Sequence, residues 1–386
     1  MNYNFLNKLL DLPQRNLLYK EILNNFRQVN NIENIRYKEF IIEDGIIPVI
    51  KISEHLKFNE IQTVKVFLAA QHNEYNGLFG ILEFFNDLIE GKVKINSYLK
   101  KYQVLFFLPL MNPYGLLYPN IENKSGYYLK TGENLNRFWR RTFVPEYKGN
   151  ESDLSYLILP EQTKILKNVI EKYWLEQNIK IYFMDFHETS LLQRYMLKLN
   201  RNLSYESYTY KFSHWIEERI IWNIIKLFNI PYRKPLFKKC SSSSNHSHIN
   251  LSPKEIDLLC EKLQEYLIKN NKKMPFYYCH SKNAYEYCEH LAQKVYNKLK
   301  SKLWETKFLT YNHKFDEHGC FIKMSDVTKR EHVYSMELES RKEFFNIFEE
   351  IENAKSHSNY YEEKLDDIKI GIELAYNTIV EMIQIF

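Results

Sequence analysis

Residues that could bind a metal ion occur in two short polar segments, each directly after a β-rich run of the 386-residue chain. The segments are QHNE at residues 71–74 and DFHET at residues 185–189. A catalytic zinc ion takes three nitrogen or oxygen donors from the protein and keeps an open position for water. His72, Glu74 and His187 are donors of these types. The sequence therefore predicts a zinc site where the two segments converge.

Two other segments carry side chains for the remaining steps of such chemistry. Glu339, in YSMELESR at residues 334–341, can act as a general base toward metal-activated water. Arg137, in GENLNR at residues 132–137, can hold a substrate carboxylate through two parallel hydrogen bonds. Singly, each feature has an ordinary explanation, such as a hydrogen-bonded loop histidine or a solvated glutamate. Their joint occurrence at successive strand exits indicates a common site.

The elements that must position these segments alternate between strands and helices. Short β-rich runs predict strands, and apolar residues at helical spacing predict helices. The expected strands cover residues 37–44, 47–52, 63–70, 103–110, 180–186 and 331–340, and the expected helices cover residues 77–91, 160–177 and 361–384. This alternation predicts a three-layer α/β/α fold with a mixed, largely parallel central sheet. In such a fold, ligand sites lie past the carboxyl ends of the strands.

The chain is expected to have three parts. Residues 1–34 carry apolar side chains at helical spacing and predict a helical lead-in. Residues 35–190 and 331–386 are expected to form the α/β domain. The intervening residues 191–330 have mainly helical patterns and hold all five cysteines, so we expect a helical insertion there.

Composition narrows the classes of protein to which the chain can belong. With 45% hydrophobic and 26% charged residues it is globular, and its net charge of +5 does not require a nucleic acid or an anionic membrane as partner. The longest apolar run, residues 104–111, is too short to span a bilayer. The odd number of cysteines and the lack of a signal-peptide pattern at the N-terminus predict a cytoplasmic protein.

In their order along the chain, these segments resemble the zinc metallocarboxypeptidase superfamily, which includes carboxypeptidase A-like enzymes and the succinylglutamate desuccinylase/aspartoacylase branch. The turn NPYG at residues 112–115 matches the family's Asn-Pro-x-Gly turn. The resemblance implies that Asn136 and Arg137 bind the substrate carboxylate, that His187 is the last Zn²⁺ ligand, and that Glu339 is the base. It covers roughly residues 35–190 and 330–386, and we place no counterpart for residues 191–330.

The first ligand pair departs from the family's His-x-x-Glu spacing. Counting back three residues from Glu74 leads to Gln71, whereas His72 lies only two residues before Glu74. Either Gln71 replaces the first ligand, or one loop residue is missing and His72 still binds. Register slightly favours Gln71, because a substitution disturbs the backbone less than a deletion does.

Three further features concern residues around the expected ligands and base. The oxyanion-stabilising arginine of carboxypeptidases has no clear match, and the nearby basic residues are Lys124, Lys130, Arg140 and Arg141. Glu337 shares a strand face with Glu339 and could raise the pKa of that carboxyl as a like-charge neighbour. Asp185 lies two residues before His187 and could orient its imidazole.

The resemblance implies a zinc-dependent hydrolase that cleaves an amide bond adjacent to a free carboxylate. The expected substrate is a peptide or an N-acyl amino acid. The short helical segment after Glu339 favours a carboxypeptidase, whereas DFHETS at residues 185–190 resembles the deacylase branch. A different class remains open, namely a non-catalytic relative that binds carboxylates or peptides and has a degraded metal site. The insertion could form a lid that narrows the range of substrates.

Overall fold

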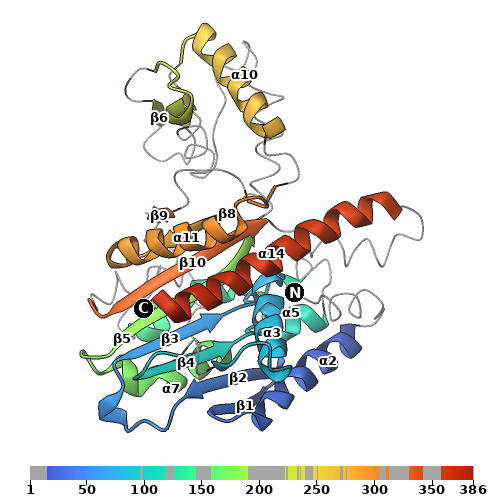
Figure 1. Cartoon of the computed structure of the whole chain (residues 1–386), viewed down its shortest axis with the longest axis vertical. Helices are drawn as coiled ribbons and strands as arrows, with labels where there is room; N and C mark the ends of the chain where they lie inside the picture. Colours follow the sequence, from blue (N-terminus) through green and yellow to red (C-terminus); the bar gives the residue numbers. More distant parts are fainter. Residues whose placement is uncertain are drawn as a thin grey trace. The chain divides into compact units, whose positions relative to one another are not determined.

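A mixed eight-stranded sheet occupies the centre of the molecule, with its strands in the order β1-β2-β4-β3-β5-β10-β8-β9 (Figure 1). The strands are β1 (Ile35–Ile42), β2 (Gly45–Ser53), β3 (Thr63–Leu68), β4 (Gln103–Leu108), β5 (Lys180–Thr189), β8 (Phe276–His280), β9 (Thr310–Asn312) and β10 (Val333–Arg341). The central strands β4, β3 and β5 are parallel, whereas β1–β2, β2–β4 and β10–β8 pair antiparallel. The predicted fold class is confirmed.

The structure is a computed structural model, and it describes only part of the chain. The described residues are 15–95, 99–118, 126–144, 158–189, 222, 225–232, 234, 236–239, 247–249, 251–269, 273–274, 276–303, 310–312, 330–341 and 358–385.

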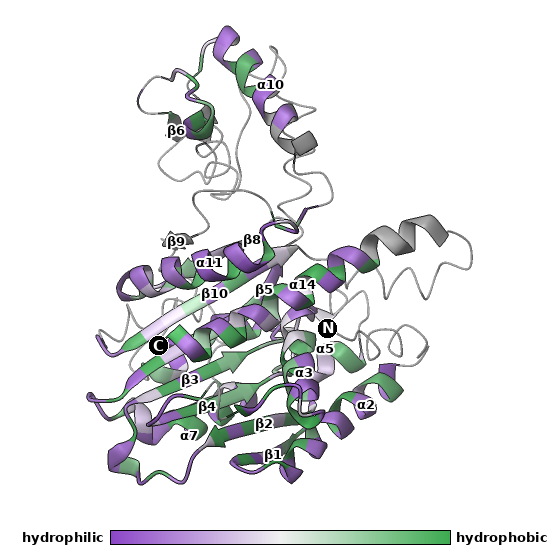
Figure 2. Cartoon of the chain, viewed as in Figure 1, coloured by the Kyte–Doolittle hydropathy of each residue, from purple (hydrophilic) through white to green (hydrophobic). Residues whose placement is uncertain are grey.

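Helices cover both faces of this sheet. They are α2 (Arg15–Gln28), α3 (Asn76–Ile89), α5 (Pro113–Leu117), α6 (Trp139–Phe143), α7 (Glu161–Trp174), α11 (Tyr285–Leu299) and α14 (Ser358–Ile385). Helix α14 packs beside α3 and α11, and all three lie on the near face in Figure 1, with α7 behind the sheet. Figure 2 shows hydrophilic and hydrophobic residues alternating along α11 and α14, as expected of helices with one face on a sheet.

The alternation of side chains along the central strand β3 explains why two layers of helices are needed. Val64, Val66 and Leu68 belong to the apolar core that includes residues of α7. Phe67 points to the opposite face, where its ring stacks on that of Phe107 with the centroids 4.7 Å apart. Because successive strand residues point to opposite faces, both faces of β3 are buried and each requires a covering layer.

The described residues form two compact units. The first comprises residues 1–188, 276–299 and 309–386, and the second comprises residues 189–275 and 300–308. The expected insertion, residues 191–330, therefore includes a stretch that belongs to the sheet: β8 pairs with β10, and α11 packs on α14. The apolar run of β8 is only five residues long and lies between helical segments, so its pattern did not reveal a strand.

The second unit, described by itself, contains helix α10 (Pro253–Lys269) and an antiparallel strand pair. The pair consists of β6 (Phe237–Lys239) and β7 (Ser247–Ile249). A single parallel bridge joins Met274 and Leu303. Two of the five cysteines that fall within residues 191–330, Cys279 and Cys288, lie in the first unit and are buried free thiols.

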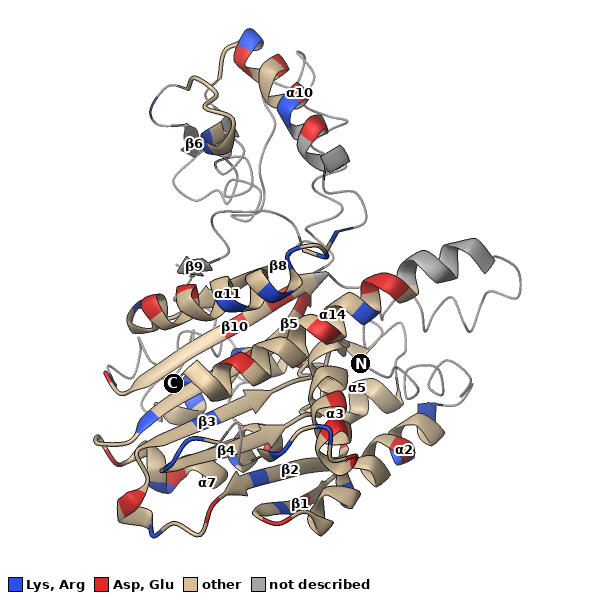
Figure 3. Ribbon diagram, in the orientation of Figure 1, with Lys and Arg blue, Asp and Glu red and all other residues tan. Residues whose placement is uncertain are grey.

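Acidic and basic residues are interspersed over the described helices, strands and loops (Figure 3). No helix in the described part of the chain combines the length and the apolar character that a membrane-crossing segment needs.

The close packing of α3 on β5 depends on a residue without a side chain. A Cβ atom added at Gly77 would lie 2.2 Å from the Cβ of Phe186, which is far closer than any van der Waals contact. We expect Gly77→Ala to lower the free energy of unfolding by about 1–3 kcal/mol, since a methyl group forced into a packed core displaces its neighbours. Asn86→Ala on the same helix is the control, because it changes helix propensity without adding a methyl group against Phe186. Equal stability of the two variants in urea unfolding would contradict this packing.

A lysine is buried under the C-terminal end of α14. Lys65 of β3 is fully buried, and its Nζ donates to the carbonyl oxygens of Met382 at 2.8 Å and Ile383 at 2.9 Å. These carbonyls belong to the last turn of α14, which has no partners for them within the helix. Burial, together with the charge of Lys100, lowers the pKa of Lys65 to about 6.

This burial makes the stability of the fold depend on pH. An unfolded chain holds the lysine proton up to a pKa of about 10.4, so between about pH 6 and 10 the unfolded state binds more protons than the folded state. The free energy of unfolding should therefore rise with pH in this window, by up to about 1.4 kcal/mol per pH unit from this group. Lys65→Met should remove that contribution, which urea titrations at pH 6.5 and 8.5 would measure. The prediction fails if both proteins show the same pH dependence.

Candidate metal centre

The loop after β3 leaves the sheet beside the turn that follows β4. The backbone N–H groups of Met111 and Asn112 donate to the carbonyls of Ala69 and Ala70, at 3.1 Å and 2.9 Å, and extend the parallel pairing past both strands. Ala70 has a φ of +52°, in the left-handed region that turns the chain sharply. Residues 71–74 consequently project from the carboxyl edge of the sheet.

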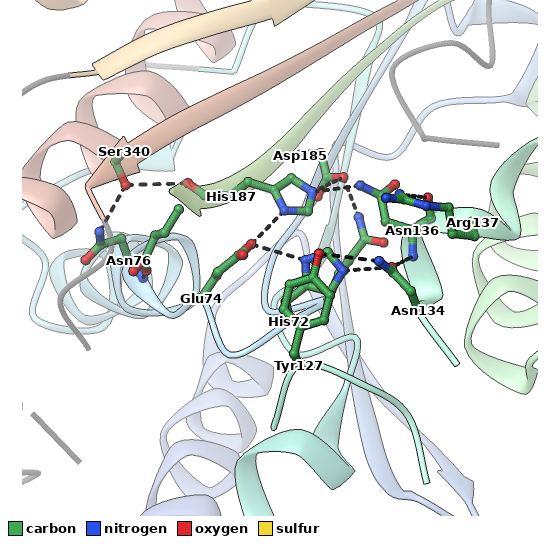
Figure 4. Close-up of polar contacts among 12 residues, drawn as sticks. His72, Glu74, Asn76, Tyr127, Asn134, Asn136, Arg137, Asp185, His187 and Ser340 are labelled. Atoms are coloured by element: carbon green, nitrogen blue, oxygen red, sulfur yellow. Dashed lines mark hydrogen bonds and ion pairs between the residues drawn. The ribbon is translucent and has the colours of Figure 1, made fainter. Parts of the chain in front are cut away.

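Three of the predicted ligands meet at this edge. Oε2 of Glu74 lies 2.7 Å from Nδ1 of His187 and 3.3 Å from Nδ1 of His72 (Figure 4). One donor atom from each of these residues lies within 4.8 Å of the other two, and all three side chains are buried. His187 comes from the end of β5, so the convergence of the two segments that the sequence predicts is present.

These donors suit a divalent zinc ion. Two imidazole nitrogens and one carboxylate oxygen form a common protein ligand set of catalytic zinc, with a fourth position left for water. Both histidines present the same ring atom, Nδ1, toward the Glu74 carboxylate. Each ring therefore keeps its Nε2 atom for a second partner, which zinc-binding histidines generally have.

The second partner of His72 is an amide in the segment at residues 132–137. Nε2 of His72 lies 2.9 Å from Oδ1 of Asn134, and the ring of Tyr127 stacks on the His72 ring with the centroids 4.0 Å apart. Nδ2 of Asn134 donates to the Tyr127 hydroxyl at 3.3 Å. Burial, followed by the charge of Glu74, raises the pKa of Tyr127 to about 12, so this phenol is neutral at physiological pH. Sequence reasoning missed Tyr127 because it lies in an irregular stretch without any motif.

Gln71 has different partners. Its Oε1 accepts a hydrogen bond from the indole N–H of Trp139 at 2.7 Å, and its amide N–H donates to Oδ2 of Asp185. Of the two alternatives for the first ligand, these contacts favour His72, whose Nδ1 faces Glu74, over Gln71, whose carbonyl oxygen is already engaged. Register alone favoured Gln71, because spacing does not reveal the direction of a side chain.

The second partner of His187 is Asp185. Nε2 of His187 lies 2.9 Å from Oδ2 of Asp185, as the spacing of two residues along β5 suggested. Burial by itself lowers the pKa of His187, but the carboxylates of Asp185, Glu337 and Glu74 outweigh it and raise this pKa well above its usual value. A metal ion at Nδ1 of His187 would compete with a proton for that atom, so binding there should weaken at low pH.

The two glutamates of β10 lie side by side on one face of the strand, next to this cluster. A carboxylate oxygen of Glu337 lies within 4.8 Å of ligand atoms of Asp185 and His187. Burial raises the pKa of Glu339 well above its usual value, and the neighbouring Glu337 raises it further. Within the described residues, the buried Oε2 atom of Glu339 has no hydrogen-bond partner. Glu339 is thus a carboxyl group with an unused oxygen next to the candidate metal ligands.

A tyrosine on the neighbouring strand faces this glutamate. Tyr277 of β8 is the cross-strand partner of Glu339, so the two side chains share one face of the sheet. Burial, and then the charges of Glu339, Cys279 and Glu337, raise the pKa of Tyr277 well above its usual value. This residue was missed because the sequence analysis placed it in the insertion.

A hydrogen-bond network ties together three of the chain segments that carry the site. The backbone N–H of Asn76, at the start of α3, donates to Oε1 of Glu188 at 2.5 Å. Its side-chain amide donates to Oγ of Ser340 at 3.0 Å, and that hydroxyl lies 3.5 Å from the carbonyl of His187. The ends of β5 and β10 and the start of α3 are therefore held at fixed spacing (Figure 4).

The expected carboxylate-binding pair lies on the other side of the cluster. Asn136 is buried, and its Nδ2 lies 3.5 Å from Nε2 of His187. Arg137 is partly buried and donates from Nη1 to the carbonyl of Asn136 at 3.0 Å. Both belong to a short 3-10 turn, Leu135–Arg137, that follows Asn134. The pair is therefore close to the expected ligands, as the sequence predicts.

The basic residues considered as candidates for stabilising the oxyanion lie in different parts of the structure. Lys130 is exposed, and its ammonium group forms an ion pair with the carboxylate of Glu43 at the surface. Arg140 and Arg141 lie on α6, directly after the turn that carries Arg137. Lys124 lies outside the described residues.

Comparisons with known proteins place the chain near one group of structures. No family model matches it, and no curated protein matches it by sequence. It is similar to bovine thrombin-activatable fibrinolysis inhibitor in complex with tick carboxypeptidase inhibitor, with a TM-score of 0.47 and 10% identity over 96% of this chain and 95% of that chain.

Two other solved structures give similar values. For a metallo-carboxypeptidase from Burkholderia cenocepacia the TM-score is 0.46 at 11% identity, covering 93% of this chain and 66% of that one. For carboxypeptidase A from Helicoverpa armigera the TM-score is 0.41 at 13% identity, covering 92% and 71%. The structural neighbours are thus metallocarboxypeptidases, the group that the sequence resembles. Likeness at this level carries no argument about activity, which has to come from the chain's own residues.

Proposed function

We propose that this protein is a zinc-dependent hydrolase that cleaves an amide bond adjacent to a free carboxylate, in the manner of a metallocarboxypeptidase. The observation that supports this most is the convergence of His72, Glu74 and His187, whose donor atoms lie within 4.8 Å of one another at the carboxyl edge of the sheet. These three residues would hold the ion. A bound zinc ion supplies Lewis acidity to a substrate carbonyl and to water.

The other residues have roles that follow from their chemistry and position. Arg137 holds the free carboxylate of the substrate with its planar guanidinium, and Asn136 supports it from the adjacent position. Glu339 takes a proton from the attacking water and returns it to the leaving amine. The unused Oε2 atom of Glu339 leaves this group available for that proton. We keep the cytoplasmic location as a prediction.

Metal analysis of the purified protein tests the proposal first. After expression in zinc-replete medium we expect about one zinc ion per chain, removable with a chelator and restored by added zinc. The zinc-loaded protein should release C-terminal amino acids from peptides, and amidation of the substrate's C-terminus should abolish cleavage. Absence of zinc from the protein would support a non-catalytic binding module, and cleavage of N-acyl amino acids but not of peptides would support a deacylase.

A further inference from the structure

A chain of buried hydrogen bonds runs behind the candidate metal ligands and is not used by the proposed reaction. It begins at the indole N–H of Trp139, which donates to Oε1 of Gln71 at 2.7 Å. The amide N–H of Gln71 then donates to Oδ2 of Asp185. The same oxygen of Asp185 lies 2.9 Å from Nε2 of His187. Four side chains from three segments, namely α6, the loop after β3 and β5, are thereby linked in a line that ends at the ring of a candidate ligand.

Because these groups are buried, each hydrogen bond in the line has a defined donor and a defined acceptor. Trp139 and Asp185 are fully buried, Gln71 is 1% exposed, and His187 is 5% exposed, so water does not compete for these groups. The indole can only donate, and therefore Oε1 of Gln71 must be the atom that faces Trp139. The NH₂ group of Gln71 is then left to face Asp185, and it fixes the position of the carboxylate.

The position of Asp185 determines which nitrogen of His187 is available to a cation. A carboxylate only accepts hydrogen bonds, so Nε2 of His187 carries a hydrogen toward Asp185. The other nitrogen, Nδ1, points at Glu74 from 2.7 Å and is the atom that a metal ion would bind. A hydrogen-bonded carboxylate behind a ligand histidine also raises its basicity and holds its ring in plane.

We propose that Gln71, held by Trp139, is a positioning residue for the metal centre: it locks Asp185 so that this carboxylate accepts Nε2–H of His187 and leaves Nδ1 for zinc. The inference rests on the proposed function and extends it. It also accounts for a glutamine at the place where the family pattern expects a metal-binding histidine. An indole only donates hydrogen bonds and a carboxylate only accepts them, so the residue between Trp139 and Asp185 must both accept and donate. The side-chain amide of Gln71 does both.

Two substitutions break the chain at different points. Gln71→Met keeps the length of the side chain and removes both hydrogen bonds, and Trp139→Phe removes only the indole donor. We expect Gln71→Met to lower the zinc affinity about 10–100-fold, the usual effect of losing a residue that orients a ligand. Trp139→Phe should lower it by a smaller factor. Competition with a chromophoric chelator measures both affinities.

The second readout does not depend on metal. The Nε2–H proton of His187 should give a low-field NMR signal that is protected from solvent exchange in the metal-free protein, assigned by its absence from a His187→Gln variant. We expect this signal to weaken through faster exchange in Gln71→Met. A protein that binds no zinc but shows the signal and its loss would contradict the proposed function and leave the positioning role standing.

Matched controls exist elsewhere in the fold. Gln162 is also buried and donates to a carboxylate, Oδ2 of Asp44 at 2.8 Å, and Trp174 lies in the same apolar core as Trp139. Gln162→Met and Trp174→Phe should leave the zinc affinity and the His187 signal unchanged. The proposal is overturned if Gln71→Met abolishes zinc binding altogether, since Gln71 would then be a ligand. It is equally overturned if Trp139→Phe leaves the affinity unchanged or raises it, as expected where the indole competes with zinc for the Gln71 oxygen.

Discussion

The Glu339→Gln variant is expected to bind zinc like the unmodified protein and to turn over peptide about 10²–10⁴-fold more slowly, the usual contribution of a positioned general base. The amide has the size of the carboxyl group but cannot take a proton from water. Glu339 is not among the three converging donors, so its replacement should leave the ligand set intact. Measurement of kcat together with zinc content separates the two effects.

Glu337→Gln is the matched control, because Glu337 lies two residues away on the same face of β10. We expect it to keep most of the activity and to shift the acid limb of the pH–rate profile to lower pH. The sign follows from electrostatics: the charge of Glu337 raises the pKa of Glu339, so its removal lets Glu339 lose its proton at lower pH. If Glu337→Gln loses turnover while Glu339→Gln retains it, the base is Glu337.

His72→Ala should lose zinc almost completely. The reason is geometric: Nδ1 of His72 is one of only two imidazole nitrogens that face the Glu74 carboxylate in the described site, and two remaining donors do not hold a catalytic zinc ion tightly. The loss should exceed the 10–100-fold expected for an orienting residue. Zinc titration of the purified variant, followed by the peptide assay, gives both numbers.

The zinc affinity of an Asn134→Ala variant should be compared with that of His72→Ala, because a smaller loss is expected. Asn134 contacts Nε2 of His72 at 2.9 Å and lies behind the ring, so its removal should weaken zinc binding without abolishing it. If His72→Ala retains stoichiometric zinc, the ligand set proposed here is wrong, and the register-based assignment of Gln71 regains support.

The central part of the fold could be predicted from the sequence because its signals are strong and local. The strands β3, β4 and β5 are largely apolar and are buried along almost their whole length, as expected of strands covered on both faces. The strand β8 could not be predicted in the same way. Its five residues lie between two helices, and what makes it a strand is pairing with β10, which is more than fifty residues away in sequence.

The same distinction applies to the site. The residue types and their strand-end positions indicated which segments would meet, because carboxyl ends of parallel strands lie at one edge of a sheet. Spacing could not indicate that His72 faces Glu74 while Gln71 faces Asp185, since that depends on one backbone angle at Ala70 and on the indole of Trp139. Tyr127 and Asn134 contact His72 from a loop whose path no periodic pattern describes.

Two of the covalent junctions of the second unit lie next to strands of the site. This unit begins at Thr189, two residues after His187, and its first segment ends at Pro275, two residues before Tyr277. A slip of one position in β8 would turn Tyr277 and Cys279 to the opposite side of the sheet. Any shortening, exchange or grafting of the second unit must therefore preserve the register of β8 at the join before Phe276.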